Sequence, residues 1–141
     1  MIKIYTDGSC LGNPGNGGWA AIINNQGNIS KISGHQKNTT NNQMELLAAI
    51  KALKKIPIKQ EVQLYTDSKY VKMGITEWIK KWSQNNWKTS SKQKVKNLEL
   101  WKELNIISKK HKIKWFWVKS HAGNPSNEEV DVLAKKAANL V

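Results

Sequence analysis

Three short segments near the start of the chain, residues 2–6, 18–23 and 29–35, have patterns typical of strands: apolar and polar side chains alternate from residue 2, and 18–23 is a short apolar run. A period of two is typical of strands that bury one face. The turn sequence Asn24-Asn25-Gln26-Gly27 separates the second segment from the third, as in a hairpin. We therefore expect an antiparallel meander of three strands.

A helical period follows in residues 44–56, where apolar residues such as Leu46 and Ile50 recur every three or four positions. Capping residues at 39–42 predict the start of this helix, and Pro57 predicts its end. In chain order, the remaining pattern predicts a strand at 62–66, a helix at 68–82 broken at Gly74, a polar irregular stretch at 83–91, a helix at 95–111, a strand at 113–118 and a helix at 127–140.

Strands that come first and then alternate with helices predict a mixed α/β fold, a five-stranded sheet flanked by helices on both faces. The strand-helix-strand order from 2–6 to 62–66 implies that these two strands are parallel. A chain of 141 residues can bury one core and is too short for two ordinary domains, so we expect a single domain over 1–141.

The charge is strongly positive, with 23 Lys and Arg residues against 10 acidic ones, a net charge of +13. Every cation is a lysine, which suits phosphate groups better than base edges, so we expect backbone binding to nucleic acid. An AT-rich genome would also raise the lysine content. No apolar stretch approaches membrane-spanning length, and the lone Cys10 has no disulfide partner in the chain, which together predict a cytoplasmic protein.

Two predicted strands run into the same dipeptide, Thr6-Asp7 and Thr66-Asp67. If both strands lie in one sheet, the two aspartates meet at its rim, where carboxylates about 4 Å apart repel by about 4 kcal/mol at an effective dielectric constant near 20. Each aspartate alone would be read as a cap of a turn or helix. The matched pair favours a divalent cation between them.

Two further carboxylates stand on apolar stripes of predicted helices. Glu45 shares its stripe with Ala49 and Leu53, and Asp131 shares its stripe with Ala134. The alternatives are a first-turn acid that complements the helix dipole and a solvated flank residue. Four converging carboxylates predict a magnesium site, with manganese as a possible substitute, and the lack of a Cys and His cluster argues against zinc.

His121 lies in a loop with Gly123 and Pro125, between the last predicted strand and the helix that carries Asp131. A histidine beside a metal site can shuttle protons or assist product release. The alternative is an ordinary surface histidine.

Four blocks of the sequence form a specific set. They are residues 5–15 (YTDGSCLGNPG), 39–46 (TTNNQMEL), 66–68 (TDS) and 121–125 (HAGNP), the last followed by Asn127 and Asp131. Together they resemble ribonuclease H of the bacterial type 1 family over essentially the whole chain. The resemblance implies endonucleolytic cleavage of the RNA strand of RNA/DNA hybrids, with little sequence specificity and with 5′-phosphate and 3′-hydroxyl ends.

In that family's pattern, Asp7, Glu45, Asp67 and Asp131 are the ligands of up to two metal ions, and His121 assists turnover. A basic protrusion is expected at about 75–97, and no obligate protein partner, so the protein should be a monomer. Lys69 stands where bacterial members often carry glutamine. The implied substrate contacts are Cys10, Asn13, Asn41 and Asn42 for ribose hydroxyls, Thr40, Asn41 and Asn97 for a DNA-strand phosphate, Trp78 for a deoxyribose, and Lys80, Lys81, Trp82, Trp87 and Lys88 for charge and stacking.

Two other functions compete with this interpretation. One is a non-catalytic nucleic-acid-binding domain that keeps the fold, although the presence of all four acidic positions argues against it. The other is a nuclease of the same superfold that acts on DNA junctions or ends, or a domain of a reverse transcriptase. A comparison of cleavage on hybrid, RNA duplex and DNA duplex separates them.

Overall fold

Five strands form one mixed sheet. The structure is a computed structural model that describes residues 1–57, 59–89, 91–119 and 124–141. The strand order is β3-β2-β1-β4-β5; β1, β2 and β3 pair antiparallel, while β1, β4 and β5 pair parallel, which confirms the mixed sheet. The strands are β1 (Ile2–Cys10), β2 (Gly15–Asn25), β3 (Asn28–Thr39), β4 (Glu61–Thr66) and β5 (Lys112–Trp117).

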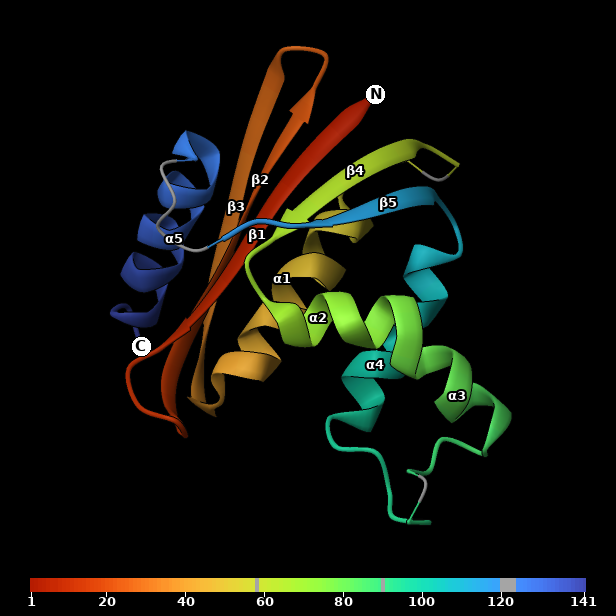
Figure 1. Cartoon of the computed structure of the whole chain (residues 1–141). Coiled ribbons are helices and arrows are strands. Elements are labelled where there is room, and N and C mark those ends of the chain that lie inside the picture. Colours follow the sequence, from red (N-terminus) through yellow and green to blue (C-terminus); the bar gives the residue numbers. More distant parts are fainter. Residues whose placement is uncertain (58, 90, 120–123) are drawn as a thin grey trace.

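Helices cover both faces of the sheet, as expected. Figure 1 shows α5 on one side of the sheet, and α1, α2 and α4 on the other. Within the described ranges, no helix is both long and apolar enough to cross a membrane. The helices are α1 (Asn41–Lys54), α2 (Lys69–Met73), the π-helix η1 (Gly74–Trp78), α3 (Ile79–Gln84), α4 (Leu98–Ser108) and α5 (Pro125–Ala138).

The main core lies between the sheet and α1. Alternate residues of β1 and β4, such as Ile4 and Leu64, are fully buried against Leu46 and Leu53 of α1. A smaller apolar cluster on the other face joins β2 to α5 through Ala20, Ile22, Val130 and Ala134. The period of two in the strands and the helical period in α1 are therefore satisfied by the same layer of contacts.

The break predicted at Gly74 is a change of helix type: the α-helix α2 ends at Met73, and the backbone continues from Gly74 as the π-helix η1. A Cβ atom at Gly74 would lie 1.9 Å from the ring of Trp101, so the close approach of that ring is what requires glycine. The helix predicted from residue 95 begins at Leu98, after Asn97 takes a left-handed φ of 59°. Val95 is nevertheless buried, which explains why it belongs to the apolar pattern.

Candidate active site

The two Thr-Asp dipeptides lie side by side, as predicted. Thr6 of β1 is paired in register with Thr66 of the parallel strand β4, so Asp7 and Asp67 are the next residue on each chain segment. One detail was wrong: β1 does not end at Asp7 but continues to Cys10, because its pairing with β2 extends that far. Asp7 is therefore held inside a strand, while Asp67 follows the end of β4.

Glu45 reaches this pair from α1. The backbone N–H of Gly8 donates to Glu45 Oε1 and also to Asp7 Oδ1, the latter over 2.9 Å. A Cβ atom at Gly8 would lie 2.5 Å from the backbone nitrogen of Glu45, so only glycine lets α1 come this close to β1. Sequence reasoning missed Gly8, although its place directly after Asp7 was a signal.

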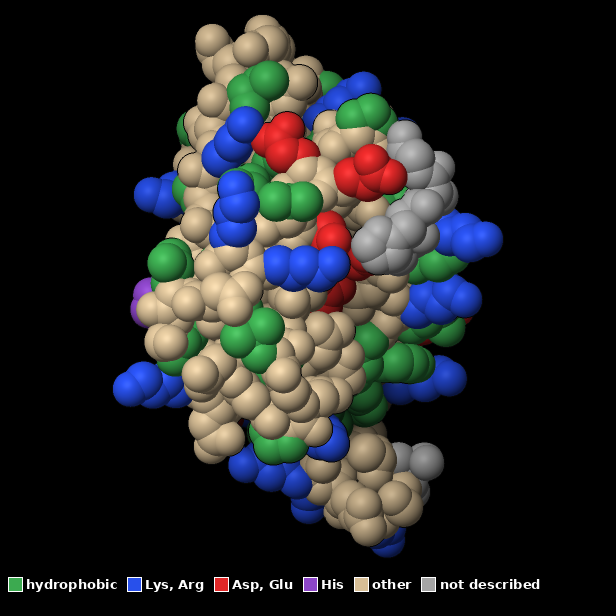
Figure 2. All heavy atoms as spheres, turned by 90° about the vertical axis from the view of Figure 1, so that its left-hand side faces the viewer, with side chains coloured by type: hydrophobic (Ala, Val, Ile, Leu, Met, Phe, Trp, Pro, Cys, Tyr) green, Lys and Arg blue, Asp and Glu red, His purple; other side chains and the backbone are tan. Residues whose placement is uncertain are grey.

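Three carboxylates converge in this way. One ligand oxygen from each of Asp7, Glu45 and Asp67 lies within 4.8 Å of the others. Asp7 and Glu45 are each only 4% exposed, and Asp67 is half-buried. Figure 2 looks onto the α5 side of the molecule, where acidic side chains gather among lysines.

Asp131 adds a fourth carboxylate from α5. It is half-buried, its charge acts on Asp7, and it forms an ion pair with Lys135 over 3.1 Å. The four acidic positions predicted from the sequence thus come from β1, α1, the end of β4 and α5. His121 lies outside the described residues, so its predicted role stays a prediction.

Burial and mutual repulsion make the two deepest carboxyls hard to ionise. Burial raises the pKa of Asp7 to about 8, and the charges of Asp67 and Asp131 contribute to the rise, while its hydrogen bond with Glu45 acts in the opposite direction. Burial also raises the pKa of Glu45 well above its usual range, followed by the charge of Asp7. Without a cation, both groups should therefore bind protons more tightly than ordinary carboxyls do.

The donor set fits a hard divalent cation. Asp7 Oδ2 is buried and has no hydrogen-bond partner among the described residues. A buried polar oxygen without a partner is costly, and a cation would both satisfy it and relieve the repulsion among the carboxylates. Oxygen ligands of this kind suit magnesium or manganese.

The predicted hydroxyl and phosphate contacts gather around the start of α1. The backbone N–H of Asn41 donates to Asn13 Oδ1 over 3.1 Å, so the loop after β1 is held against the start of α1. Thr40 caps α1 by accepting from Gln43 N over 3.2 Å, and Gln43 Nε2 donates to Asn97 Oδ1 over the same distance. Gln43, which the sequence analysis did not single out, thus links Thr40 to Asn97.

The other two predicted residues of this region lie close by. Cys10 Sγ donates to the carbonyl oxygens of Gly15 and Thr39 over 3.5 and 3.3 Å, and Asn42 is exposed in the first turn of α1. Lys94 and Lys96 line a hollow together with Gln43 and Asn97. The arrangement places amide groups and lysines around the N-terminus of one helix, which is a favourable surface for phosphate.

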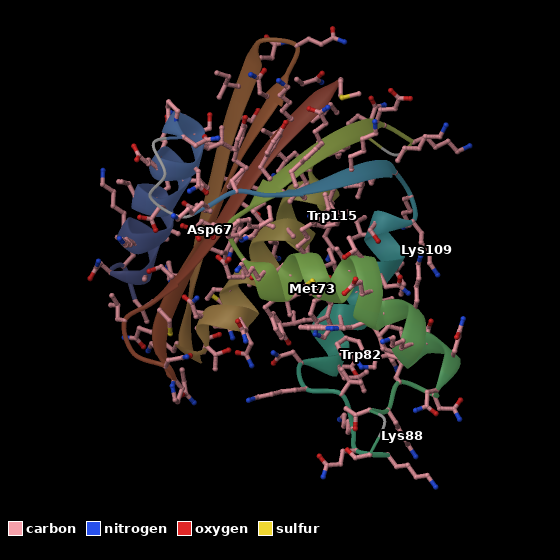
Figure 3. The ribbon with its side chains drawn as sticks, in the orientation of Figure 1. Asp67, Met73, Trp82, Lys88, Lys109 and Trp115 are labelled. Atoms are coloured by element: carbon pink, nitrogen blue, oxygen red, sulfur yellow. The ribbon has the colours of Figure 1, made fainter. Side chains whose placement is uncertain are left out.

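The segment predicted as a basic protrusion holds a second hollow. Trp78 and Trp82 line it with Lys81 and Lys88, and Figure 3 shows Trp82 and Lys88 on an arm that leads away from Asp67. Both tryptophans are half-buried and lie with their ring centroids 5.8 Å apart.

Two residues predicted for the same surface are placed differently. Lys80 lines a separate hollow between α3 and α4, next to Lys109. Trp87 is half-buried and lies under Lys102, whose Nζ is 5.8 Å from the ring centroid. The structure therefore brings together Trp78, Lys81 and Lys88 but not Lys80.

Comparison with known proteins decides the family. The family model for RNase H matches residues 1–139. The chain belongs to the ribonuclease H family. It is therefore an enzyme, an endoribonuclease. The chain is 58% identical over 136 residues to a ribonuclease H of Wolbachia sp. subsp. Drosophila simulans (strain wRi), covering 96% of this chain and 94% of that one. A ribonuclease H of Francisella philomiragia is 53% identical, covering 96% and 90%.

Solved structures agree with this assignment. LC9-RNase H1, described as a type 1 RNase H with the type 2 active-site motif, superposes with a TM-score of 0.86 at 33% identity, covering 98% of this chain and 72% of that one. LC11-RNase H1, solved in complex with an RNA/DNA hybrid, gives a TM-score of 0.71 at 26% identity, covering 99% and 98%. The fold and the resemblance proposed from the sequence are both confirmed.

Lys69, which the sequence resemblance suggested as a departure from the family pattern, lies against an aromatic ring. Its Nζ lies 4.9 Å from the ring centroid of Trp117, and Trp117 Nε1 donates to the backbone carbonyl of Asp67 over 2.9 Å. The lysine is therefore held against the indole that contacts the Asp67 backbone. Trp117 itself is 37% exposed.

Proposed function

We propose that this ribonuclease hydrolyses the RNA strand of RNA/DNA hybrids with little sequence preference, leaving 5′-phosphate and 3′-hydroxyl ends. The observation that carries the proposal is the convergence of Asp7, Glu45 and Asp67 within 4.8 Å, with Asp131 acting on Asp7 from α5. LC11-RNase H1, which this chain resembles in fold, was solved with such a hybrid.

In this proposal, Asp7, Glu45, Asp67 and Asp131 hold up to two magnesium ions, for which manganese can substitute. When bound, divalent cations supply Lewis-acid stabilisation of the charge that develops on the phosphate and the leaving oxygen. Gly8 keeps Glu45 beside Asp7 through its N–H, so that the carboxylates are already positioned before substrate arrives. His121 is proposed to assist turnover.

The surface around the start of α1 is proposed to recognise the two strands. The backbone near Cys10 and Asn13, with Asn41 and Asn42, would contact ribose 2′-hydroxyls, which distinguish RNA from DNA. Thr40, Asn41 and Asn97 would hold a DNA-strand phosphate, and the Gln43 link supports their joint placement. The proposed substrate contacts of the segment at about 75–97 are Trp78, Lys80, Lys81, Trp82, Trp87 and Lys88.

The test uses end-labelled RNA/DNA hybrid, RNA duplex and DNA duplex, each with magnesium. We expect cleavage of the RNA strand of the hybrid alone, and Asp7→Asn should abolish it while the circular dichroism spectrum is unchanged. Glu61→Gln, which alters an exposed carboxylate at the far end of β4, is the matched control and should retain activity. Equal cutting of all three duplexes, or no cutting with metal present, would refute the substrate assignment.

We further propose that the protein works as a cytoplasmic monomer formed by one domain over 1–141. Sedimentation of the purified chain tests the monomer. A sedimentation coefficient that rises with concentration toward that of a dimer would contradict it.

A further inference from the structure

Part of one sheet face carries an aromatic stack that the proposed function does not use. Helix α5 packs on β2, β1 and β3, and Figure 1 shows β4 and β5 extending beyond it. On β1, β4 and β5, alternate residues point away from the main core toward this face. The face is therefore partly open next to the edge strand.

Three rings on this face form a continuous column. Tyr5, Tyr65 and Phe116 are paired in register across β1, β4 and β5. The ring centroids of Tyr5 and Tyr65 are 4.8 Å apart with an interplanar angle of 11°, and those of Tyr65 and Phe116 are 5.0 Å apart with an angle of 17°. Because β5 is the last strand of the sheet, the column ends at Phe116, which is 37% exposed.

Lysines flank the column on one side. Two residues earlier on each strand stand Lys3, Gln63 and Lys114, again paired in register. Both lysines are exposed, and neither forms an ion pair with any described residue. The Tyr65 hydroxyl donates to Gln63 Oε1 over 3.1 Å, which fixes the central ring of the column.

The carboxylates of the active site flank the column on the other side. Asp7 and Asp67 lie two residues beyond Tyr5 and Tyr65, a separation of about 7 Å along an extended strand. The open end of the column at Phe116 thus combines an aromatic face, nearby cations and proximity to the catalytic groups. A base with its phosphate has the matching chemistry, since the base continues the stack and the phosphate meets the lysines.

We propose that Phe116 binds an unpaired base of a nucleic-acid strand, with Lys114 close to the adjoining phosphate. This site goes beyond the proposed hybrid cleavage, because bases inside a hybrid are paired and cannot continue the column. It would hold a single-stranded segment that flanks a hybrid; only this connection to cleavage rests on the proposed function. The competing explanation is that the three rings only stabilise the sheet as cross-strand pairs, in which case no base contacts Phe116.

Crosslinking locates the contact directly. The full chain, kept in EDTA to prevent cleavage, is irradiated with a short single-stranded DNA that contains 5-iodouracil, and the crosslinked peptides are identified by mass spectrometry. We expect a crosslink at Phe116 that is lost in Phe116→Ala and restored in Phe116→Trp. Ile106→Ala, which alters an exposed apolar residue on α4, is the control and should leave that crosslink intact. Crosslinks confined to Trp78, Trp82 and Trp87 would overturn the proposal.

Affinity separates stacking from charge. Phe116→Ala should weaken binding of the ordinary oligonucleotide about tenfold, equivalent to about 1.4 kcal/mol, and leave binding of an abasic oligonucleotide unchanged. A thermal melt confirms that the variant is folded under the assay conditions. Equal affinity of the variant and the unaltered chain for the ordinary oligonucleotide would refute the site. Cleavage of a blunt hybrid by the unaltered chain tests the proposed function separately, because this substrate has no unpaired base.

Discussion

In the absence of divalent cations, the stability of the protein should fall as the pH rises from about 4 to about 8. Burial holds the pKa of Asp7 at about 8 in the folded chain, against an ordinary value of 3.8 for an exposed aspartate. Between these two values the folded chain keeps a proton that the unfolded chain has lost. Raising the pH therefore favours unfolding. The stabilisation from Asp7 is fully present below the pKa that Asp7 has in the unfolded chain, and it is lost as the pH rises through the pKa that Asp7 has in the folded chain.

The slope expected for one such proton is about 1.4 kcal/mol per pH unit. From about pH 5 to about pH 7, Asp7 should therefore lower the free energy of unfolding by about 3 kcal/mol. A loss of this size is large against a total stability of about 5 to 15 kcal/mol. Asp7→Asn removes this titrating group, so the variant should lack the part of the slope that Asp7 contributes and keep the part that buried Glu45 contributes.

The assay is urea denaturation of the unaltered chain and of Asp7→Asn in EDTA, at several pH values in this range. The difference between the two free energies of unfolding reports the loss of the Asp7 carboxyl together with its effect on Glu45, because charges distant from the site contribute equally to both chains. Glu61→Gln is the control and should follow the unaltered chain. Parallel pH profiles for the unaltered chain and Asp7→Asn would refute the assignment of Asp7 as a buried carboxyl that keeps its proton.

Three further results are expected. Gly8→Ala should force α1 away from β1 and lower the free energy of unfolding by about 1 to 3 kcal/mol. It should also reduce the rise in melting temperature that magnesium causes, and an unchanged rise would contradict the role of Gly8. Glu45→Gln should raise the melting temperature in EDTA by relieving repulsion and blunt the magnesium effect, as a thermal titration would show. Lys88→Gln should reduce the salt dependence of hybrid affinity by about one unit of log–log slope, whereas an unchanged slope would remove Lys88 from the phosphate contacts.

The convergence of the acidic side chains was predictable because it follows from two periodic patterns. The parallel register of β1 and β4 places Asp7 beside Asp67, and both follow an identical Thr-Asp dipeptide. Glu45 was found through the apolar stripe on which it stands, since a carboxylate on that stripe has to face the sheet. These predictions needed only local periods and one correct strand pairing.

Contacts between distant residues were not predictable in the same way. Gln43 accepts from Thr39 Oγ1 over 2.7 Å and donates to Asn97, which lies 54 positions further along the chain. The need for glycine at position 74 depends on where the Trp101 ring lies, and the helical periods around residues 74 and 101 do not contain that information. The pattern of Tyr5, Tyr65 and Phe116 likewise becomes a column only once the register of three strands is known.

The packing that creates the candidate metal site should also make the protein less stable when no cation is bound. Gly8 allows β1 and α1 to approach so closely that its single N–H contacts both Asp7 and Glu45, yet that one donor leaves Asp7 Oδ2 without a partner among the described residues. A second protein donor there would lower the pKa of Asp7 and stabilise the fold, but it would occupy an oxygen that a cation requires. The unsatisfied oxygen is thus a cost of keeping the ligand available, and a bound cation would offset it through ionic interactions with the same carboxylates.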